Sequence, residues 1–189
     1  VAGELVRRLP DALMQTHISE SPGEIATVKR LFPNERDYTA VYERFGLIHE
    51  RSILAHGIHL SESECQRLSE AGATIAHCPT SNNFLGSGLM SMPKLLKAER
   101  PVGVAMATDV GGGTSYSMLT TMGEAYKVQM MHGYRAQATE FFRMVTLDNA
   151  RALRIDVDTG SLDVGKFADV VVLDAKATPV LAARQELSQ

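Results

Sequence analysis

The fold is decided by the stretch SILAHGIHLSESECQRLSEAGATIA, residues 52–76. Its two ends, residues 52–55 and 73–76, are short apolar runs of strand length that are bounded by turn residues. Between them, Ser61 followed by Glu64 forms a capping-box pattern that begins a helix. A strand, a helix and a second strand in this order predict a βα unit of a parallel sheet.

The same alternation extends to both sides of this unit. We predict two further strands at residues 12–17 and 102–108. Further helices are predicted at residues 22–32, 37–46, 117–131, 138–146 and 148–153. Four βα units are too few to close an eight-stranded barrel, which typically takes about 250 residues. The strands therefore form either an open sheet or half of a barrel.

The end of the chain departs from this pattern. Residues 160–173 are expected to form two β segments joined by a turn at Gly165 and Lys166. The apolar run at residues 170–173 is expected to be a fully buried strand. We therefore predict a boundary between one part at residues 1–156 and another at residues 157–189.

Composition and charge limit the class of protein. A chain of 189 residues with 44% hydrophobic residues can bury a sizeable core, so we expect globular material from one domain or part of one. Its 19 basic and 22 acidic residues give a net charge of -3 without a basic stripe, which disfavours nucleic acid and membrane surfaces as partners. The two cysteines form no C-x-x-C pair, and a reducing cytoplasm fits. Because the first residue is Val rather than Met, we expect the chain to begin inside a longer protein.

Ligand-type side chains stand at the carboxyl ends of the four predicted strands, where loops are expected to follow. In chain order they are His17 with Glu20, His56, Cys78 and Asp109. Parallel strands place active sites at this edge, so we expect these side chains to meet. Two imidazoles and a carboxylate suit Zn²⁺, and a glutamate that is not a ligand can shuttle protons. His17, His56 and Asp109 are therefore candidate metal ligands.

Each of these residues also has an ordinary structural interpretation. A single histidine at a strand end is more often a hydrogen-bonded structural residue than a ligand, and Glu20 alone is most often a solvated loop residue. Asp109 precedes three glycines and fits a tight turn. The GGGT run at residues 111–114 lacks the lysine of a P-loop, which disfavours a phosphate site. His59 and His77 lie near strand ends, where they could support a ligand.

Four sequence words occur in the order expected for one family. They are THISE at residues 16–20, LAHG at 54–57, HCPTSN at 77–82 and ATDVGGGTS at 107–115. In this order they resemble strands five to eight of the barrel of the amidohydrolase superfamily. The ending GSLDVGKFADVVVLD, residues 160–174, is similar to the strand pair with which these enzymes return to a small flanking β-sandwich.

The resemblance implies an α/β fold, namely the C-terminal half of a metal-dependent (β/α)8 barrel at residues 1–156 followed by part of a β-sandwich at residues 157–189. Within the superfamily, residues 78–88 and 108–114 are most similar to members that deaminate guanine. This implies hydrolysis of guanine to xanthine and ammonia in a cytoplasmic enzyme. It also implies zinc as the cofactor, with iron suited to the same ligand set. A homodimer is implied too, and the helical stretch at residues 117–146 is a place for its interface.

Site roles follow from the same resemblance, residue by residue. His17 and Asp109 match metal ligands of the family, and Glu20 matches its proton shuttle. His56 matches the imidazole that holds the reacting water or the substrate, and it is a metal ligand in some relatives. The catalytic set is thus Glu20, His56 and Asp109. Zinc lowers the pKa of water toward neutrality, so Asp109 can accept the water proton while Glu20 protonates the purine ring.

The sequence also departs from the family pattern. The His-x-His pair of the first barrel strand is absent, and so is the Arg-Phe segment that reads guanine in the family, which would precede His17. We therefore expect this polypeptide to lack half of the metal ligands and the substrate reader. Two alternatives stay open: another deaminase or hydrolase of the superfamily, acting on adenosine-like, cytosine-like or triazine substrates, and a non-catalytic half-barrel that binds a partner. A cytidine-type zinc deaminase is excluded, because its P-C-x-x-C pattern is missing.

Overall fold

A four-stranded sheet forms the centre of the computed structural model, which describes residues 1–96, 99, 101–174 and 176–183. Its strands are ordered β1-β2-β3-β4, and every neighbouring pair is parallel. The strands are β1 (Met14–Ile18), β2 (Ser52–His56), β3 (Thr74–His77) and β4 (Gly103–Met106). All four predicted strands are confirmed, with ends that differ by at most two residues.

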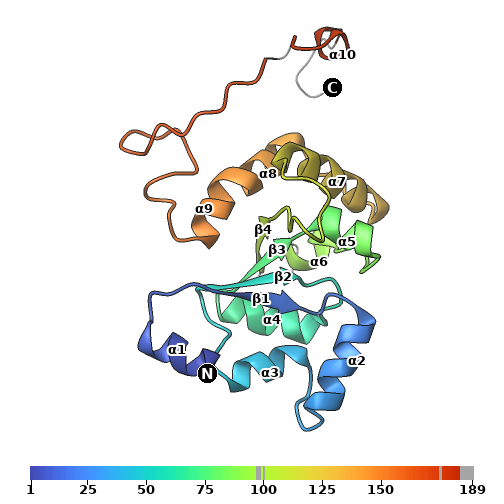
Figure 1. Ribbon diagram of the computed structural model, residues 1–189, viewed down its shortest axis with the longest axis vertical. Helices are drawn as coiled ribbons and strands as arrows, with labels where there is room; N and C mark the ends of the chain where they lie inside the picture. The colour runs from blue at the N-terminus through green and yellow to red at the C-terminus, as the bar shows by residue number, and fades with distance from the viewer. Residues whose placement is uncertain (97–98, 100, 175, 184–189) are drawn as a thin grey trace.

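Helices precede, connect and follow the strands. They are α1 (Ala2–Arg8), α2 (Pro22–Leu31), α3 (Tyr38–Arg44), α4 (Glu62–Glu70), α5 (Pro79–Leu85), α6 (Met92–Leu96), α7 (Met118–Met131), α8 (Ala138–Arg143), α9 (Asn149–Ala152) and α10 (Pro179–Ala182). Figure 1 shows α1 to α4 on the β1 side of the sheet and α7 to α9 beyond β4. None of the described helices has the length and apolar character that crossing a membrane requires.

The capping box that defines α4 forms as the sequence predicts. The Ser61 hydroxyl accepts from the Glu64 backbone N–H at 3.3 Å, and the Glu64 carboxylate accepts from the Ser61 N–H at 2.8 Å. The other carboxylate oxygen of Glu64 is buried and accepts from the Thr39 hydroxyl at 3.0 Å. This bond ties α4 to α3, so a local capping motif also fixes how two helices pack.

The two faces of the sheet differ in the size of their side chains. On one face, Leu54, Ile75 and Val104 are register neighbours and belong to the hydrophobic core. Side chains alternate along a strand, so the next register row faces the other way. That row consists of His17, Ala55, Ala76 and Ala105. His17 is therefore the one large side chain of its row.

The structure differs from the sequence prediction after β3 and after β4. The loop expected after β3 is instead α5, which has Pro79 at its first position and is followed by Gly86, a cap residue in the left-handed conformation (φ 71°). The helix predicted at residues 138–146 begins as α8 but passes into a π-helix, η1 (Met144–Asp148). The Asn149 side chain at its end bonds to both the backbone N–H and the carbonyl of Met106, at 2.9 Å each. This pair of bonds holds the end of β4.

The strand pair predicted within residues 160–173 is wrong. The chain turns at Val164 and Gly165, but none of the described residues from 157 to 174 forms a strand. Residues 170–173, expected to be buried, are between 58% and 88% exposed, and Figure 1 shows this segment extending away from the sheet. An extended segment without a neighbouring strand has nothing to pair its backbone groups or cover its side chains.

The β-sandwich assignment of residues 157–189 therefore stays a prediction. Its residues 175 and 184–189 lie outside the described part of the chain.

Candidate active site

Two imidazoles lie side by side at the carboxyl edge of the sheet. His17 is the penultimate residue of β1, and His56 is the last residue of β2. Their ring centroids are 5.2 Å apart and their planes differ by 16°, which is a stacked arrangement. His56 is buried and His17 is exposed, so the stack reaches from the core to the surface.

Two carboxylates face the inner imidazole. The Nε2 atom of His56 lies 3.6 Å from Glu20 Oε2 and 4.0 Å from Asp109 Oδ2. Both distances are longer than a hydrogen bond, and this buried nitrogen has no hydrogen-bond partner. An unpaired imidazole nitrogen that faces two carboxylates fits a divalent cation such as Zn²⁺ by the chemistry of its donor atoms. The structure thus brings together all four residues predicted for the site, His17 through its ring contact with His56.

Hydrogen bonds from two other elements hold Glu20. The Ser87 hydroxyl donates to Glu20 Oε1 at 2.8 Å, and the Glu20 backbone N–H donates to the Glu24 carboxylate at 2.7 Å. The Tyr38 hydroxyl donates to the other oxygen of Glu24 at 2.9 Å. Burial raises the pKa of Tyr38, as do its contact with the Tyr42 hydroxyl and the hydrogen bond that it donates to Glu24, so this hydroxyl keeps its proton. Both the backbone and the carboxylate of Glu20 are therefore fixed in place.

The loop that carries Asp109 depends on glycine. The Gly113 N–H donates to the Asp109 carbonyl at 2.5 Å, which folds the loop back on itself. A Cβ atom at Gly113 would lie 1.9 Å from the Thr108 carbonyl oxygen, and one at Gly112 would lie 2.6 Å from the Ser81 hydroxyl. The glycine run thus serves the close approach of backbone segments beside Asp109, in agreement with the tight turn predicted there.

Unusual backbone conformations gather at this site. Ser19, His56 and Asp109 have φ values of 47°, 72° and 46°, in the left-handed region that non-glycine residues rarely adopt. Among the described non-glycine residues only Arg154 shares this conformation. Such residues cluster at functional sites, where the surrounding structure holds them.

A cluster of possible ligand atoms differs in one member from the predicted set. One ligand atom each from His56, Cys78 and Asp109 lies within 4.8 Å of the others. Burial, and after it the charge of Asp109, raises the pKa of Cys78 to about 12, and its thiol donates to the Ala76 carbonyl at 3.3 Å. Metals bind the thiolate rather than the thiol. Because the Cys78 thiol has a partner in Ala76 whereas Nε2 of His56 has none, we take His56 and Asp109 as the candidate donors.

Two residues at the site received no role from the sequence. Asn82 Oδ1 lies 2.7 Å from His56 Nδ1, and Ser87 holds the Glu20 carboxylate. Both lie in the stretch at residues 78–88 that carries the resemblance, which is the only sign of them in the sequence. Of the two supporting histidines, His59 bonds to the Ser87 carbonyl at 2.9 Å, whereas His77 is fully buried with neither ring nitrogen hydrogen-bonded.

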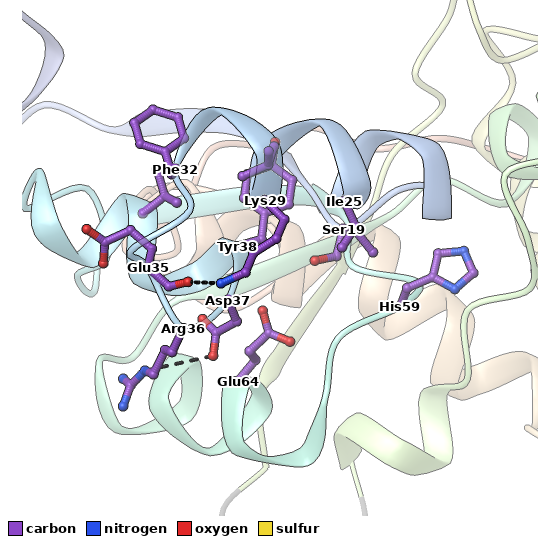
Figure 2. Close-up of a pocket in the computed structure, with 12 residues that line it drawn as sticks. Ser19, Ile25, Lys29, Phe32, Glu35, Arg36, Asp37, Tyr38, His59 and Glu64 are labelled. Carbon is purple, nitrogen blue, oxygen red and sulfur yellow. Dashed lines mark hydrogen bonds and ion pairs between the residues drawn. The ribbon is translucent and has the colours of Figure 1, made fainter.

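A separate cavity lies between α2, α3 and α4 (Figure 2) and has a volume of about 170 Å³. Of the segment from His17 to Glu20, only Ser19 lines this cavity. Its charged groups are bonded within the chain: the Lys29 ammonium donates to the Glu35 carbonyl at 2.5 Å, and Arg36 lies 3.8 Å from the Asp37 carboxylate. The strand-end cluster remains the better candidate for chemistry.

Comparison with known proteins shows which proteins this chain is similar to. Guanine deaminase of Escherichia coli (strain K12) is 43% identical over 188 residues, which cover 100% of this chain and 42% of that protein. A solved structure of E. coli guanine deaminase gives a TM-score of 0.92 at 44% identity, covering 96% of this chain and 41% of that one.

Two further solved structures are similar at 30% identity. Guanine deaminase from C. acetobutylicum with bound guanine has a TM-score of 0.77, covering 86% of this chain and 39% of that one. An adenosine deaminase from Xanthomonas campestris with bound zinc has a TM-score of 0.83, covering 92% and 39%. The chain thus spans about two fifths of the length of the relatives it matches.

The family model described as "Amidohydrolase family" matches residues 2–189, almost the whole chain. The parallel sheet, the strand-end cluster of imidazoles and carboxylates, and this match lead to one conclusion: the chain belongs to the amidohydrolase family.

Proposed function

We propose that the whole protein is a zinc-dependent guanine deaminase, which hydrolyses guanine to xanthine and ammonia, and that this chain supplies part of its active site. The observation that carries the proposal is the buried Nε2 atom of His56, which faces the Glu20 and Asp109 carboxylates without a hydrogen-bond partner. Similarity to guanine deaminases, one of them solved with bound guanine, supports the choice of substrate.

The metal would be held by His17, His56 and Asp109. When bound, zinc supplies a Lewis acid that makes water acidic enough to react at neutral pH. Iron(II) suits the same nitrogen and oxygen ligands, so metal identity is part of the test. A zinc-containing relative of 30% identity supports zinc as the first choice.

The proton transfers are assigned to the two carboxylates. Asp109 accepts a proton from water as the water oxygen bonds to the amino-bearing carbon, and Glu20 gives a proton to the adjacent ring nitrogen. The carbon is then tetrahedral. The proton of the new hydroxyl group passes through Glu20 to the amine, the carbon–nitrogen bond breaks, and ammonia leaves as the carbonyl of xanthine forms. Transfer of the Asp109 proton to Glu20 restores the starting state.

The same proposal covers the fold, the localisation and the oligomeric state of the whole protein. We assign β1 to β4 to strands five to eight of a (β/α)8 barrel, with residues 1–156 in the barrel and residues 157–189 in a flanking β-sandwich. The remaining ligands and the guanine-reading segment would come from the rest of the protein. A cytoplasmic homodimer that uses the α7 and α8 region completes the proposal.

Metal analysis and ammonia release from guanine, on the full-length protein that contains this chain, test the proposal. We expect stoichiometric zinc, ammonia from guanine, and little release from adenosine, cytosine or a triazine. Removal of the metal should abolish turnover, and added zinc should restore it more fully than iron. Turnover of adenosine in place of guanine would move the protein to another branch of the family, and a metal-free, inactive protein would overturn the proposal.

A further inference from the structure

We infer that Asn82 is a positioning residue that holds the His56 imidazole in one tautomer, with the proton on Nδ1 and the lone pair of Nε2 turned toward Glu20 and Asp109. The inference deepens the proposed function, because that function needs an unprotonated nitrogen at this position. It stands on a hydrogen bond between two buried side chains from different elements of the fold.

The two atoms that face each other in this contact support one tautomer. His56 Nδ1 and Asn82 Oδ1 are 2.7 Å apart, and both residues are only 1% exposed. The structure places the amide oxygen of Asn82, which can only accept, against Nδ1, so we assign the proton to Nδ1. A neutral imidazole has one N–H group, which leaves Nε2 with a lone pair. This is the nitrogen that faces the carboxylates of Glu20 and Asp109.

The Asn82 side chain has a rigid base. Its backbone N–H donates to the Cys78 carbonyl at 2.9 Å within α5, and its own carbonyl accepts from the Ser87 N–H at 2.9 Å where α5 ends. The position of Oδ1 is therefore set by a packed helix rather than by a loose loop.

The amide nitrogen of Asn82 is the unfavourable part of this arrangement. Its Nδ2 atom is buried and has no hydrogen-bond partner, which costs stability that an apolar side chain of similar size would not cost. The bond to His56 is the side-chain interaction that the amide does make. A neutral acceptor also differs from a carboxylate in this position, because it orients the ring without adding charge and so does not favour the imidazolium.

The consequence for a metal is direct. Hydrogen-bond partners of this kind orient ligating histidines, and their loss typically costs about 10–100-fold in metal affinity or activity. In the Asn82→Leu variant the Nδ1 proton loses its acceptor, and the tautomer with the proton on Nε2 becomes available. That tautomer has no lone pair toward Glu20 and Asp109.

The first test is the ring tautomer of His56 in the metal-free full-length protein, read from its ¹⁵N chemical shifts. The His56→Gln variant identifies the signals. We expect the Nδ1-protonated form in the wild type and a shift toward the Nε2-protonated form in Asn82→Leu. The matched control is Asn83→Leu, which changes the exposed neighbour on the same helix and should leave the tautomer unchanged. An Nε2-protonated wild type, or the same tautomer in Asn82→Leu, overturns the inference.

The second test measures zinc affinity by competition with a chelator, together with kcat and KM. Asn82→Leu should lose about 10–100-fold in zinc affinity or kcat, Asn82→Asp should restore most of this loss because it keeps an acceptor, and Asn83→Leu should match the wild type. Unchanged affinity and kcat in Asn82→Leu overturn the inference. The two proposals separate cleanly: a protein that shows the expected tautomers but leaves guanine intact refutes the guanine assignment and supports the role of Asn82.

Discussion

The imidazole rings of His17 and His56 stack at 5.2 Å although the two residues are one register step apart on neighbouring strands. His17 pairs with Ala55, and His56 pairs with Ile18. In regular strands the two rings would point to opposite faces of the sheet, because side chains alternate. The left-handed backbone at His56, with φ at 72°, breaks this alternation. A local backbone conformation thus makes a shared site out of two strands.

Substitution of His17 tests which residues hold the metal. We expect His17→Ala in the full-length protein to lose zinc and activity together, because it removes one of the proposed ligands. Cys78→Ser is the matched comparison, since the buried thiol of Cys78 donates to the Ala76 carbonyl and is not among the proposed ligands. Elemental analysis of both variants decides. Zinc retained by His17→Ala and lost by Cys78→Ser would make the cluster of His56, Cys78 and Asp109 the true site.

Glu20 is expected to affect turnover and not metal content. Glu20→Gln keeps the size of the side chain but removes its acid–base function, which contributes typically 10²–10⁴-fold to rate. We predict zinc content equal to wild type and a fall in kcat of about this size. Glu62→Gln, the same change at an exposed residue of α4, should leave both unchanged. Wild-type turnover by Glu20→Gln would contradict the proton-shuttle role.

The glycine beside Asp109 should not tolerate a side chain. Gly113→Ala would place Cβ 1.9 Å from the Thr108 carbonyl oxygen, so the loop that carries Asp109 must move. We expect a loss of about 1–3 kcal/mol in the free energy of unfolding, as for overpacked sites, together with reduced activity.

Gly123 is the opposite case. It lies inside α7, and a Cβ there would meet nothing within 4 Å. Gly123→Ala should therefore raise the free energy of unfolding by about 0.5–1 kcal/mol and leave activity intact. Denaturant unfolding measures both variants, and equal effects of the two substitutions would refute the steric argument.

His77 gives the protein a specific sensitivity to acid. Burial, with smaller contributions from His132 and His56, lowers the pKa of His77 from 6.5 to about 3. The folded protein therefore keeps His77 neutral while the unfolded chain binds a proton, so stability is present above pH 6.5 and falls as the pH drops toward 3. The slope from this one group is at most about 1.4 kcal/mol per pH unit. In His77→Leu the unfolding free energy should change less with pH, because the proton bound by His77 in the unfolded chain is no longer counted. An unchanged slope would contradict the burial of a neutral imidazole at this position.

Local sequence patterns predicted the framework of this fold well. The Ser61 and Glu64 capping box and the four strands are confirmed because each depends on nearby residues. The helix α5 was missed even though Pro79 and Gly86 mark its two ends. Residues 170–173 show the opposite error, because their apolar pattern is that of a buried strand and no described strand lies beside them.

The site was predictable only in part. The order of the strand ends indicates that His17, Glu20, His56 and Asp109 share one edge of the sheet, since parallel strands direct their carboxyl ends the same way. The contacts of Asn82 with His56 and of Ser87 with Glu20 depend on where α5 packs, and spacing in the sequence does not contain that information. The roles of all these residues remain predictions for the experiments above.

The left-handed conformations of Ser19, His56 and Asp109 set a limit on how this protein can be stabilised. A non-glycine residue in such a conformation costs on the order of 1–3 kcal/mol, and glycine at the same position would relieve it. At His56 and Asp109, however, glycine would delete the very groups that face the proposed metal. At these two positions a substitution that raises thermal stability would therefore remove catalytic groups. Stabilising substitutions have to be sought elsewhere in the chain.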